Sequence, residues 1–200
     1  MGAQTPDLFT QLFGDVVKEN GYGYNTSIEF MKIDEKAVIP KYAHDGDMCM
    51  DISVIVDSNN VPMIMDDSVH APESVQNKVI VNKLGNLNYV TLEPGQTLVF
   101  HTGLKCATSY GYGLKMYVRS STGIKKKLRL ANGTGIIDTA QYRGELLIAL
   151  NNFGSKALKI FDKDRVAQAE VVPVLRVQIK EVSSLSETER GEGGIGSTNA

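Results

Sequence analysis

The pattern of apolar positions changes character close to residue 21. Before that point, apolar residues recur at helical spacing, and Thr5, Pro6 and Gly21 suit the start and the end of a helix. The apolar positions are Leu8, Phe9, Leu12, Phe13, Val16 and Val17. Residues 1–26 are therefore predicted to form an N-terminal helical extension.

Short apolar segments separated by turn residues follow over most of the remaining chain. They are residues 28–33, 52–56, 97–100, 114–118, 145–150 and 171–182. In the last segment Leu175, Val177 and Ile179 alternate with polar residues, which is the period-two pattern of a strand with one solvated face. Many short strands divided by Gly, Pro and Asn predict an all-β domain, either a sandwich, a jelly roll or a barrel.

Two segments differ from this pattern. Residues 57–96 are polar and rich in turn residues, and we interpret them as an insert that leaves the core and contains a hairpin. Residues 183–200 contain four glycines and few apolar side chains, so they cannot bury enough surface to offset the entropy of ordering. The expected organisation is a helical extension over 1–26, a β domain over 27–182 and a flexible arm over 183–200.

Composition narrows the possible functions. The chain has 200 residues, and its 21 basic and 23 acidic residues nearly balance, which argues against a general nucleic-acid-binding protein. No segment approaches the length of about 18 apolar residues that a membrane helix needs, and the N-terminus lacks a basic-then-apolar leader. We expect a cytoplasmic protein of a bacterium or of a phage-infected host, and two free thiols, Cys49 and Cys106, rather than a disulfide.

Three segments carry candidate chemistry. Residues 190–198 place Arg190 before a glycine-rich run that ends in Ser197 and Thr198, a composition that suits phosphate binding or simply a mobile tail. Residues 135–145 form a predicted hairpin with Asp138 near its tip, either a reactive carboxylate or a hydrogen-bond acceptor of the turn. Residues 118–123 place an Arg and three hydroxyl residues directly after a strand, which suits anion binding. The basic run that follows is either a solvated loop or a segment that attracts a polyanion.

In chain order, these segments resemble the five motifs of the trimeric deoxyuridine triphosphate nucleotidohydrolase (dUTPase) family. Residues 43–52 resemble the first motif, which ends in Asp51, and Arg119, Ser120 and Ser121 resemble the second. Residues 132–145 resemble the third and most specific motif. Residues 164–168 resemble the fourth, and residues 190–198 the fifth. The resemblance spans residues 43–198.

The resemblance implies a homotrimer of jelly-roll-like β-barrels whose active sites are each assembled from all three chains. It implies hydrolysis of dUTP to dUMP and pyrophosphate, with Asp138 activating the attacking water. Tyr142 would pack under the deoxyribose and exclude a 2′-hydroxyl. Asn132 and the hairpin around Gly135 and Ile137 would recognise the uracil edge.

The phosphate-binding residues follow from the other motifs. Arg119, Ser120, Ser121 and Gln168 would contact the α- and β-phosphates, and Arg165 would support the site near Asp138 or Asp51. The arm would close over the γ-phosphate and the base with Arg190, Gly194, Ile195, Gly196, Ser197 and Thr198. Mg²⁺ would be held mainly by phosphate oxygens and waters, one of which would contact Asp51.

Two positions depart from the family pattern. Ile195 stands where the family usually has an aromatic residue that stacks on the uracil, so it can cover the base without stacking. Met48, Cys49 and Met50 fill a stretch of the first motif that is usually made of small residues.

Two other functions fit parts of the sequence. A dCTP deaminase shares the fold and a similar Arg119-Ser120-Ser121 segment, but the Asp-x-x-x-Tyr spacing of Asp138 and Tyr142 favours dUTPase. A regulatory trimer would bind a protein partner through residues 57–96, with or without catalysis.

Overall fold

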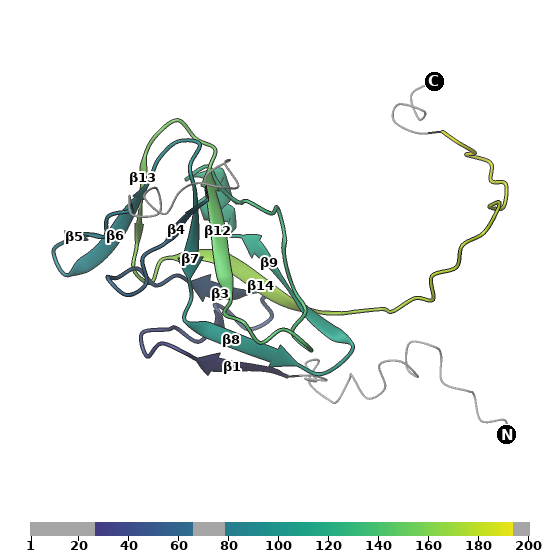
Figure 1. Cartoon of the computed structure of the whole chain (residues 1–200), viewed down its shortest axis with the longest axis horizontal. Helices are drawn as coiled ribbons and strands as arrows, with labels where there is room; N and C mark the ends of the chain where they lie inside the picture. The colour runs from purple at the N-terminus through teal and green to yellow at the C-terminus, as the bar shows by residue number, and fades with distance from the viewer. Residues whose placement is uncertain (1–26, 66–78, 194–200) are drawn as a thin grey trace.

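The computed structural model describes residues 27–65 and 79–193, and these form an all-β body with one short helix, α3 (Ser120–Ile124) (Figure 1). This confirms the predicted all-β class. The predicted N-terminal helix lies outside the described residues. None of the described helical structure is long and apolar enough to cross a membrane.

The largest sheet has five antiparallel strands in the order β11-β9-β14-β3-β2. Their bounds are β11 (Gly135–Ile137), β9 (Tyr112–Val118), β14 (Arg165–Pro173), β3 (Met50–Ser53) and β2 (Lys41–Tyr42). All three strands that carry predicted catalytic or phosphate-binding motifs, namely β3, β11 and β14, belong to this sheet.

Three smaller sheets complete the described body. One has four strands in the order β10 (Leu128–Leu130), β12 (Leu147–Asn152), β7 (Thr97–His101) and β4 (Met63–Met65). The others pair β1 (Ile28–Lys32) with β8 (Leu104–Thr108), and β13 (Leu158–Phe161) with β6 (Leu87–Leu92) and β5 (Asn82–Leu84). Because the described strands form four separate sheets, the closed jelly-roll barrel that we expected is not seen in this part of the chain.

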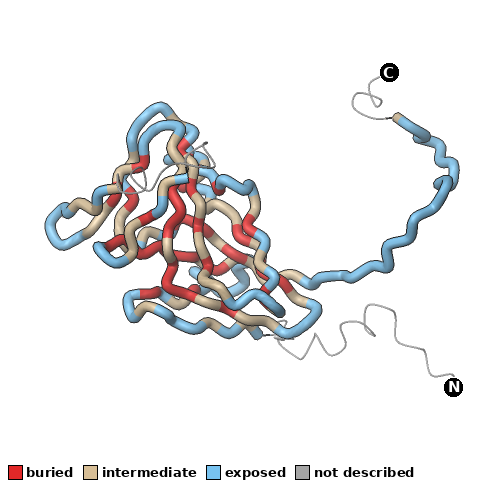
Figure 2. The backbone as a smooth tube through the Cα atoms, viewed as in Figure 1, coloured by how far each residue is buried: buried red, intermediate tan, exposed pale blue. Residues whose placement is uncertain are grey.

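The buried apolar side chains of the described residues form a core between the sheets (Figure 2). Strand β12 shows why these residues form strands: its side chains alternate, so that Ile148 and Leu150 are buried with Phe100 of β7. The next buried position is Asn152, whose amide donates to the carbonyls of Leu92 and Lys156 at 3.0 and 2.9 Å. Its polar group is therefore satisfied inside the core.

Five of the predicted strands overlap strands or bridges of the structure, and the sixth is partly wrong. Strand β14 starts earlier than expected and ends at Pro173, and residues 174–182 form no strand. Leu175, Val177 and Ile179 are 83%, 78% and 92% exposed. Proline provides no backbone N–H for a ladder, and the described part of this one chain offers the segment no strand to pair with.

The segment over residues 57–96, predicted to leave the core, contributes strands to it. Its described part contains β4 and the β5–β6 hairpin, which turns at Gly85 and Asn86. Val90 and Leu92 of β6 are fully buried in the core. This part of the predicted insert therefore supplies core strands, while residues 66–78 lie outside the described residues.

Both cysteines are free, as predicted. Cys49 is half-buried and Cys106 is buried. Burial raises the pKa of the Cys106 thiol to about 11, although Arg143 nearby opposes this shift. At neutral pH Cys106 is therefore a neutral side chain of the core rather than a thiolate nucleophile.

Asp57 holds the loop that follows the buried run Ser53–Val56. Its carboxylate accepts hydrogen bonds from Lys36 Nζ at 2.6 Å and from the backbone N–H groups of Asn59 and Asn60 at 2.8 and 2.9 Å. Burial raises the pKa of Asp57, but these bonds outweigh it, so the pKa lies below its usual value. The ionised form is thus favoured in the folded state.

Replacing Asp57 with Asn should lower the free energy of unfolding at pH 7 by about 2 kcal/mol. A depressed carboxyl pKa contributes stability above the pKa of the unfolded chain and loses it as pH falls through the folded value, so the difference should shrink below about pH 4. Urea titrations at pH 7 and pH 3.5 would measure it, with the exposed Glu93→Gln as the control. A difference that stays constant over this range would contradict the role given to the ionised carboxylate.

Candidate active site

The predicted base- and sugar-binding hairpin begins on β11, at the edge of the five-stranded sheet. Ile137 pairs with Leu114 and Gly135 with Met116 of β9. A Cβ at Gly135 would lie 3.1 Å from Met116 Cβ, so glycine lets the two strands approach closely. Asn132 lies in the exposed turn that precedes this strand. The pairing of β11 with β9 therefore sets the position of Asp138 at the edge of the sheet.

Asp138 is exposed at the start of a tight turn that ends at Tyr142. Its backbone carbonyl accepts hydrogen bonds from the N–H groups of Gln141 and Tyr142 at 2.8 and 2.7 Å. A cavity of about 390 Å³ lies beside it, and Tyr110, Tyr112, Asp138, Gln141, Val174 and Arg176 are among the residues that line it. An exposed carboxylate on a fixed turn beside a cavity can accept a proton from a bound water.

The ring of Tyr142 folds back over the chain that follows it. Its hydroxyl donates to the Glu145 carbonyl at 3.2 Å, and its phenol atoms occupy the space that a Cβ at Gly144 would fill. Arg143 braces the same turn, because its Nη1 donates to the carbonyls of Thr139 and Tyr142, each at 2.8 Å. Tyr142 remains 45% exposed and can receive a ligand on its outer face.

Glu145 anchors the far end of this hairpin, a role that the sequence did not suggest. Its Oε1 accepts the backbone N–H groups of Thr102 and Gly103 at 3.1 and 2.7 Å, and its Oε2 lies 2.9 Å from His101 Nδ1. The partners come from the β7–β8 turn, which is more than 40 residues away in the chain. A local sequence pattern carries no signal for such a contact.

Asp51, Arg119 and Arg165 form a second cluster on the same sheet. Arg119 Nε lies 2.6 Å from Asp51 Oδ1, and Arg165 Nη1 lies 2.9 Å from Asp51 Oδ2. Arg119 Nη1 also donates to the Arg165 carbonyl at 3.2 Å. Arg165 therefore takes one of the two positions that we expected for it, against Asp51, and Gln168 lies opposite Asp51 in the strand register.

Ser120 and Ser121 stand next to this cluster in the first turn of α3. Both are exposed, whereas Thr122 is buried and fixes the helix against the body. The N–H of Gly123 donates to the Arg119 carbonyl at 2.9 Å, which ties the helix to the end of β9. Arg119, Gln168 and the two serines are thus gathered at one end of the five-stranded sheet.

Asp138 lies at the other end of this sheet. It follows Ile137, which pairs with Leu114 of β9. Asp51 instead pairs with Gln168 of β14, and Gln168 pairs with Tyr117 of β9. Strand rise and the three strand spacings between β11 and β3 place Asp138 roughly 20 Å from Asp51. Within one chain, the predicted base and the predicted phosphate-binding residues are therefore too far apart to act on the same phosphate group.

The described part of the predicted arm leaves the body after β14 (Figure 1). Arg190 is exposed there, and its Nε donates to the Gly193 carbonyl at 2.9 Å. Gly194, Ile195, Gly196, Ser197 and Thr198 lie outside the described residues. Their predicted contacts with substrate stay predictions.

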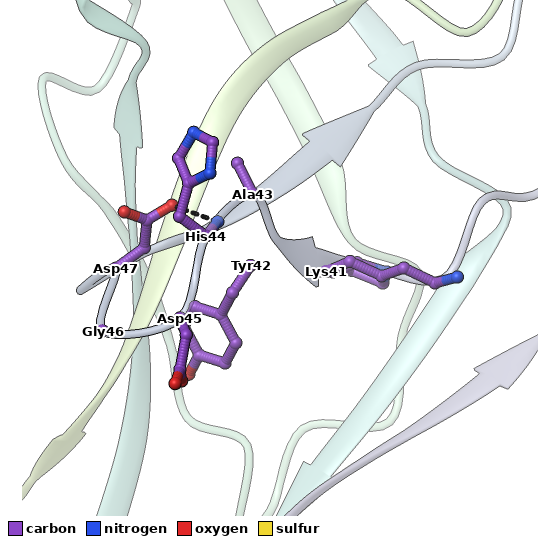
Figure 3. A pocket seen from close by; sticks show the side chains of 8 residues that line it. Lys41, Tyr42, Ala43, His44, Asp45, Gly46 and Asp47 are labelled. Atoms are coloured by element: carbon purple, nitrogen blue, oxygen red, sulfur yellow. Dashed lines mark hydrogen bonds between the residues drawn. The ribbon is translucent and has the colours of Figure 1, made fainter.

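A larger cavity, about 610 Å³, lies elsewhere, in the loop over residues 40–47 (Figure 3). The N–H of His44 donates to Asp47 Oδ2 at 2.8 Å and closes this loop. The larger cavity is lined by residues 43–47 of the first motif-like segment, whereas the smaller one holds Asp138 and is the candidate active site. Within residues 27–65 and 79–193, no group of three or more His, Cys, Asp or Glu side chains could hold a metal ion.

Known proteins of one family are similar to this chain. The dUTPase family model matches residues 83–199. A deoxyuridine 5′-triphosphate nucleotidohydrolase of Alkaliphilus metalliredigens is 33% identical over 172 residues, which cover 86% of this chain and 96% of that protein. A protein of the same name from Crocosphaera subtropica is 31% identical over 171 residues, covering 86% and 97% of the two chains.

Solved structures show the same fold. A Staphylococcus bacteriophage 80alpha dUTPase with dUpNHpp superposes with a TM-score of 0.61 at 22% identity, covering 86% of this chain and 97% of that chain. The dUTPase of phage phi11 of S. aureus gives a TM-score of 0.60 at 20% identity, covering 81% and 99%. With sequence relatives that match over nearly their whole length, the family is shown: this chain belongs to the dUTPase family.

Proposed function

We propose that this protein hydrolyses dUTP to dUMP and pyrophosphate, with Asp138 as the general base. The observation that carries the proposal is the exposed Asp138 carboxylate, held on a tight turn beside a cavity and followed by Tyr142. The curated relatives are named for this activity, and the phage 80alpha neighbour was solved with dUpNHpp, a dUTP analogue.

In the proposed reaction, Asp138 accepts a proton from a water molecule as the water oxygen attacks the α-phosphorus. The bond between the α-phosphorus and the oxygen that bridges to the β-phosphorus breaks, and pyrophosphate leaves with that electron pair. Asp138 is exposed, so a water and a substrate can both reach its carboxylate. The hydrogen-bonded backbone of the turn holds the Asp138 carboxylate where it can orient the water for in-line attack.

The hairpin would select base and sugar. Tyr142, folded over Gly144, presents a ring against which a deoxyribose packs and a 2′-hydroxyl does not fit. Asn132 and the backbone at Gly135 and Ile137 would pair with the uracil edge. Such pairing discriminates strongly, because a wrong base leaves buried polar groups without partners.

Arg119, Ser120, Ser121 and Gln168 would bind the α- and β-phosphates. Asp51 supports this part of the site by fixing both Arg119 and Arg165. Arg190 and the arm beyond it, through Gly194, Ile195, Gly196, Ser197 and Thr198, would close over the substrate. Guanidinium and hydroxyl groups are suited to this task, since they donate hydrogen bonds to phosphate oxygens.

We infer that each site is shared between subunits of a homotrimer. The separation of about 20 Å between Asp138 and the Asp51 cluster supports this, because both must act on one triphosphate. The exposed Leu175, Val177 and Ile179 support it too, since an alternating apolar face gains stability when a neighbouring subunit covers it. A protein partner for residues 57–96 stays a prediction.

The residues present fit a Mg²⁺ ion that arrives with the triphosphate better than one held by the protein alone. Each carboxylate oxygen of Asp51 already faces a guanidinium, so the side chain offers contact through water rather than a bare ligand set. When bound, Mg²⁺ would neutralise charge on the departing pyrophosphate.

Pyrophosphate release from dUTP, dTTP, dCTP and UTP tests the activity. We expect dUTP to exceed the other three by at least about a hundredfold in kcat/KM, since the hairpin selects both base and sugar. Tyr142→Ala should reduce the preference for dUTP over UTP. Ammonia release from dCTP would instead support a deaminase, and equal rates with dUTP and UTP would remove the role given to Tyr142.

A further inference from the structure

The turn that carries Asp138 has internal bonds that fix its shape but not its place on the sheet. The N–H groups of Gln141 and Tyr142 donate to the carbonyl of Asp138, and the N–H of Thr139 donates to the Ile137 carbonyl at 2.9 Å. Asp138, Gln141 and Tyr142 are all exposed. Besides the pairing of β11 with β9 and the bonds of Glu145, contacts from outside the hairpin hold the turn near the carboxylate.

The first such contact comes from Thr108, at the end of β8. Thr139, the residue directly after Asp138, is completely buried, and its Oγ1 lies 2.5 Å from Thr108 Oγ1. The backbone N–H of Thr108 also points to the Thr139 carbonyl, at 3.4 Å. Thr108 thus contacts both the side chain and the backbone of the residue next to Asp138.

The number of hydroxyl protons sets the direction of the bonds between Thr139, Thr108 and Tyr112. Each threonine hydroxyl has one proton to donate. Thr108 Oγ1 donates its proton to the Tyr112 carbonyl at 3.2 Å, so Thr139 must donate to Thr108. The result is a one-way chain from Thr139 through Thr108 to the first residue of β9. Removing the middle hydroxyl would leave the buried hydroxyl of Thr139 without its acceptor.

The second contact comes from Tyr110, in the turn between β8 and β9. The side-chain amide of Gln141 donates to the Tyr110 hydroxyl. Tyr110, Gln141 and Asp138 line the same cavity of about 390 Å³. The end of β8 and the β8–β9 turn therefore contact the turn that carries Asp138 at two positions, 139 and 141.

We propose that Thr108 and Tyr110 are positioning residues for Asp138, acting through Thr139 and Gln141 respectively. We call the four side chains the tip clamp. The proposal rests on the proposed function of Asp138, but it adds two residues outside every motif-like segment of the chain. A small displacement of a general base is costly, because misplacement by about 1 Å can lower a rate by about a hundredfold.

The test compares Thr108→Val, which keeps shape but loses the hydroxyl, with Thr108→Ser, which keeps the hydroxyl. With dUTP, Thr108→Val should lower kcat about ten- to a hundredfold and leave KM within about threefold, as expected when only the reacting geometry changes. Thr108→Ser should recover most of the rate. Thr97→Val is the matched control, because Thr97 is also a strand residue whose hydroxyl accepts a bond, from Asn151 at 3.0 Å, away from Asp138.

A double-mutant cycle and a surface variant make the outcome decisive. Thr108→Val and Thr139→Val act on one bond, so the double variant should be no slower than the slower single variant. Tyr110→Phe tests the second contact at a 73% exposed side chain, where folding is not at risk, and should lower kcat about three- to tenfold.

Wild-type kcat in both Thr108→Val and Tyr110→Phe would overturn the proposal, as would losses that multiply in the double variant. A loss in Thr97→Val as large as that in Thr108→Val would also overturn it. The proposed function is judged separately, by turnover of dUTP in the wild type and its loss in Asp138→Asn. The tip clamp can fail while that function stands.

Discussion

Replacing Asp138 with Asn is expected to lower kcat for dUTP about a thousandfold, the size of effect that follows the loss of a general base. Asparagine keeps the shape of the side chain but cannot accept the proton of the attacking water. The turn itself should survive, because its hydrogen bonds run through the backbone carbonyl of Asp138 and not through the carboxylate. KM should change little, since the phosphate- and base-binding groups remain.

Initial rates of pyrophosphate release over a range of dUTP concentrations would separate kcat from KM. Glu93→Gln makes the same exchange of a carboxylate for an amide at an exposed turn between β6 and β7, and it should behave as the wild type. Near-wild-type kcat in Asp138→Asn would mean that another group activates the water. A large rise in KM with unchanged kcat would place Asp138 in substrate binding instead.

The strands were predictable where a run of several apolar residues forms them. Residues 146–150 are all apolar, and in β12 the alternate residues Ile148 and Leu150 are buried. Short strands such as β10 and β13 escaped prediction, since three or four residues give too few positions for a period to show. Leu128 and Leu130 of β10, for example, follow directly on a run of lysines.

The segment after Pro173 has the pattern of a strand but forms none in the described chain. The alternation of Leu175, Val177 and Ile179 is real, but in one chain these side chains are exposed. A period-two pattern indicates that a face will be buried without saying which chain will bury it. The prediction of a strand was wrong for the described single chain, and its physical premise, a face in need of a cover, supports the proposed trimer.

The candidate site was predictable where chemistry is local and hidden where it depends on tertiary contacts. Asp138 and Arg119 stand out because reactive residue types occur in short, turn-linked runs. Thr108 and Glu145 do not, since their partners lie 31 and more than 40 residues away, and a threonine at the end of a strand is unremarkable alone. The sequence therefore indicates candidate reacting groups, whereas the contacts that hold them in place are visible only in the fold.

The second large effect is a gain of activity on mixing two inactive variants. Asp138→Asn lacks the proposed base, and Arg119→Ala lacks a proposed phosphate ligand while Asp51 keeps Arg165 as a partner. The two clusters lie roughly 20 Å apart in one chain, so a working site should take Asp138 from one subunit and Arg119 from another. The variants would be co-expressed with different tags and purified on both, which leaves only mixed trimers.

Each mixed trimer contains one neighbouring pair in which the Arg119→Ala chain supplies Asp138 and the Asp138→Asn chain supplies Arg119. Mixed trimers should therefore regain about a third of wild-type turnover, since one of three shared sites is intact. Two differently tagged Asp138→Asn chains, purified in the same way, should stay inactive. If the mixed trimers were as inactive as the single variants, the two clusters would have to serve one site within a chain. The separation along the five-stranded sheet would then have to close by a rearrangement of β9 and β14, whose seven-residue pairing from Ala167–Val118 to Pro173–Tyr112 leaves little freedom for it.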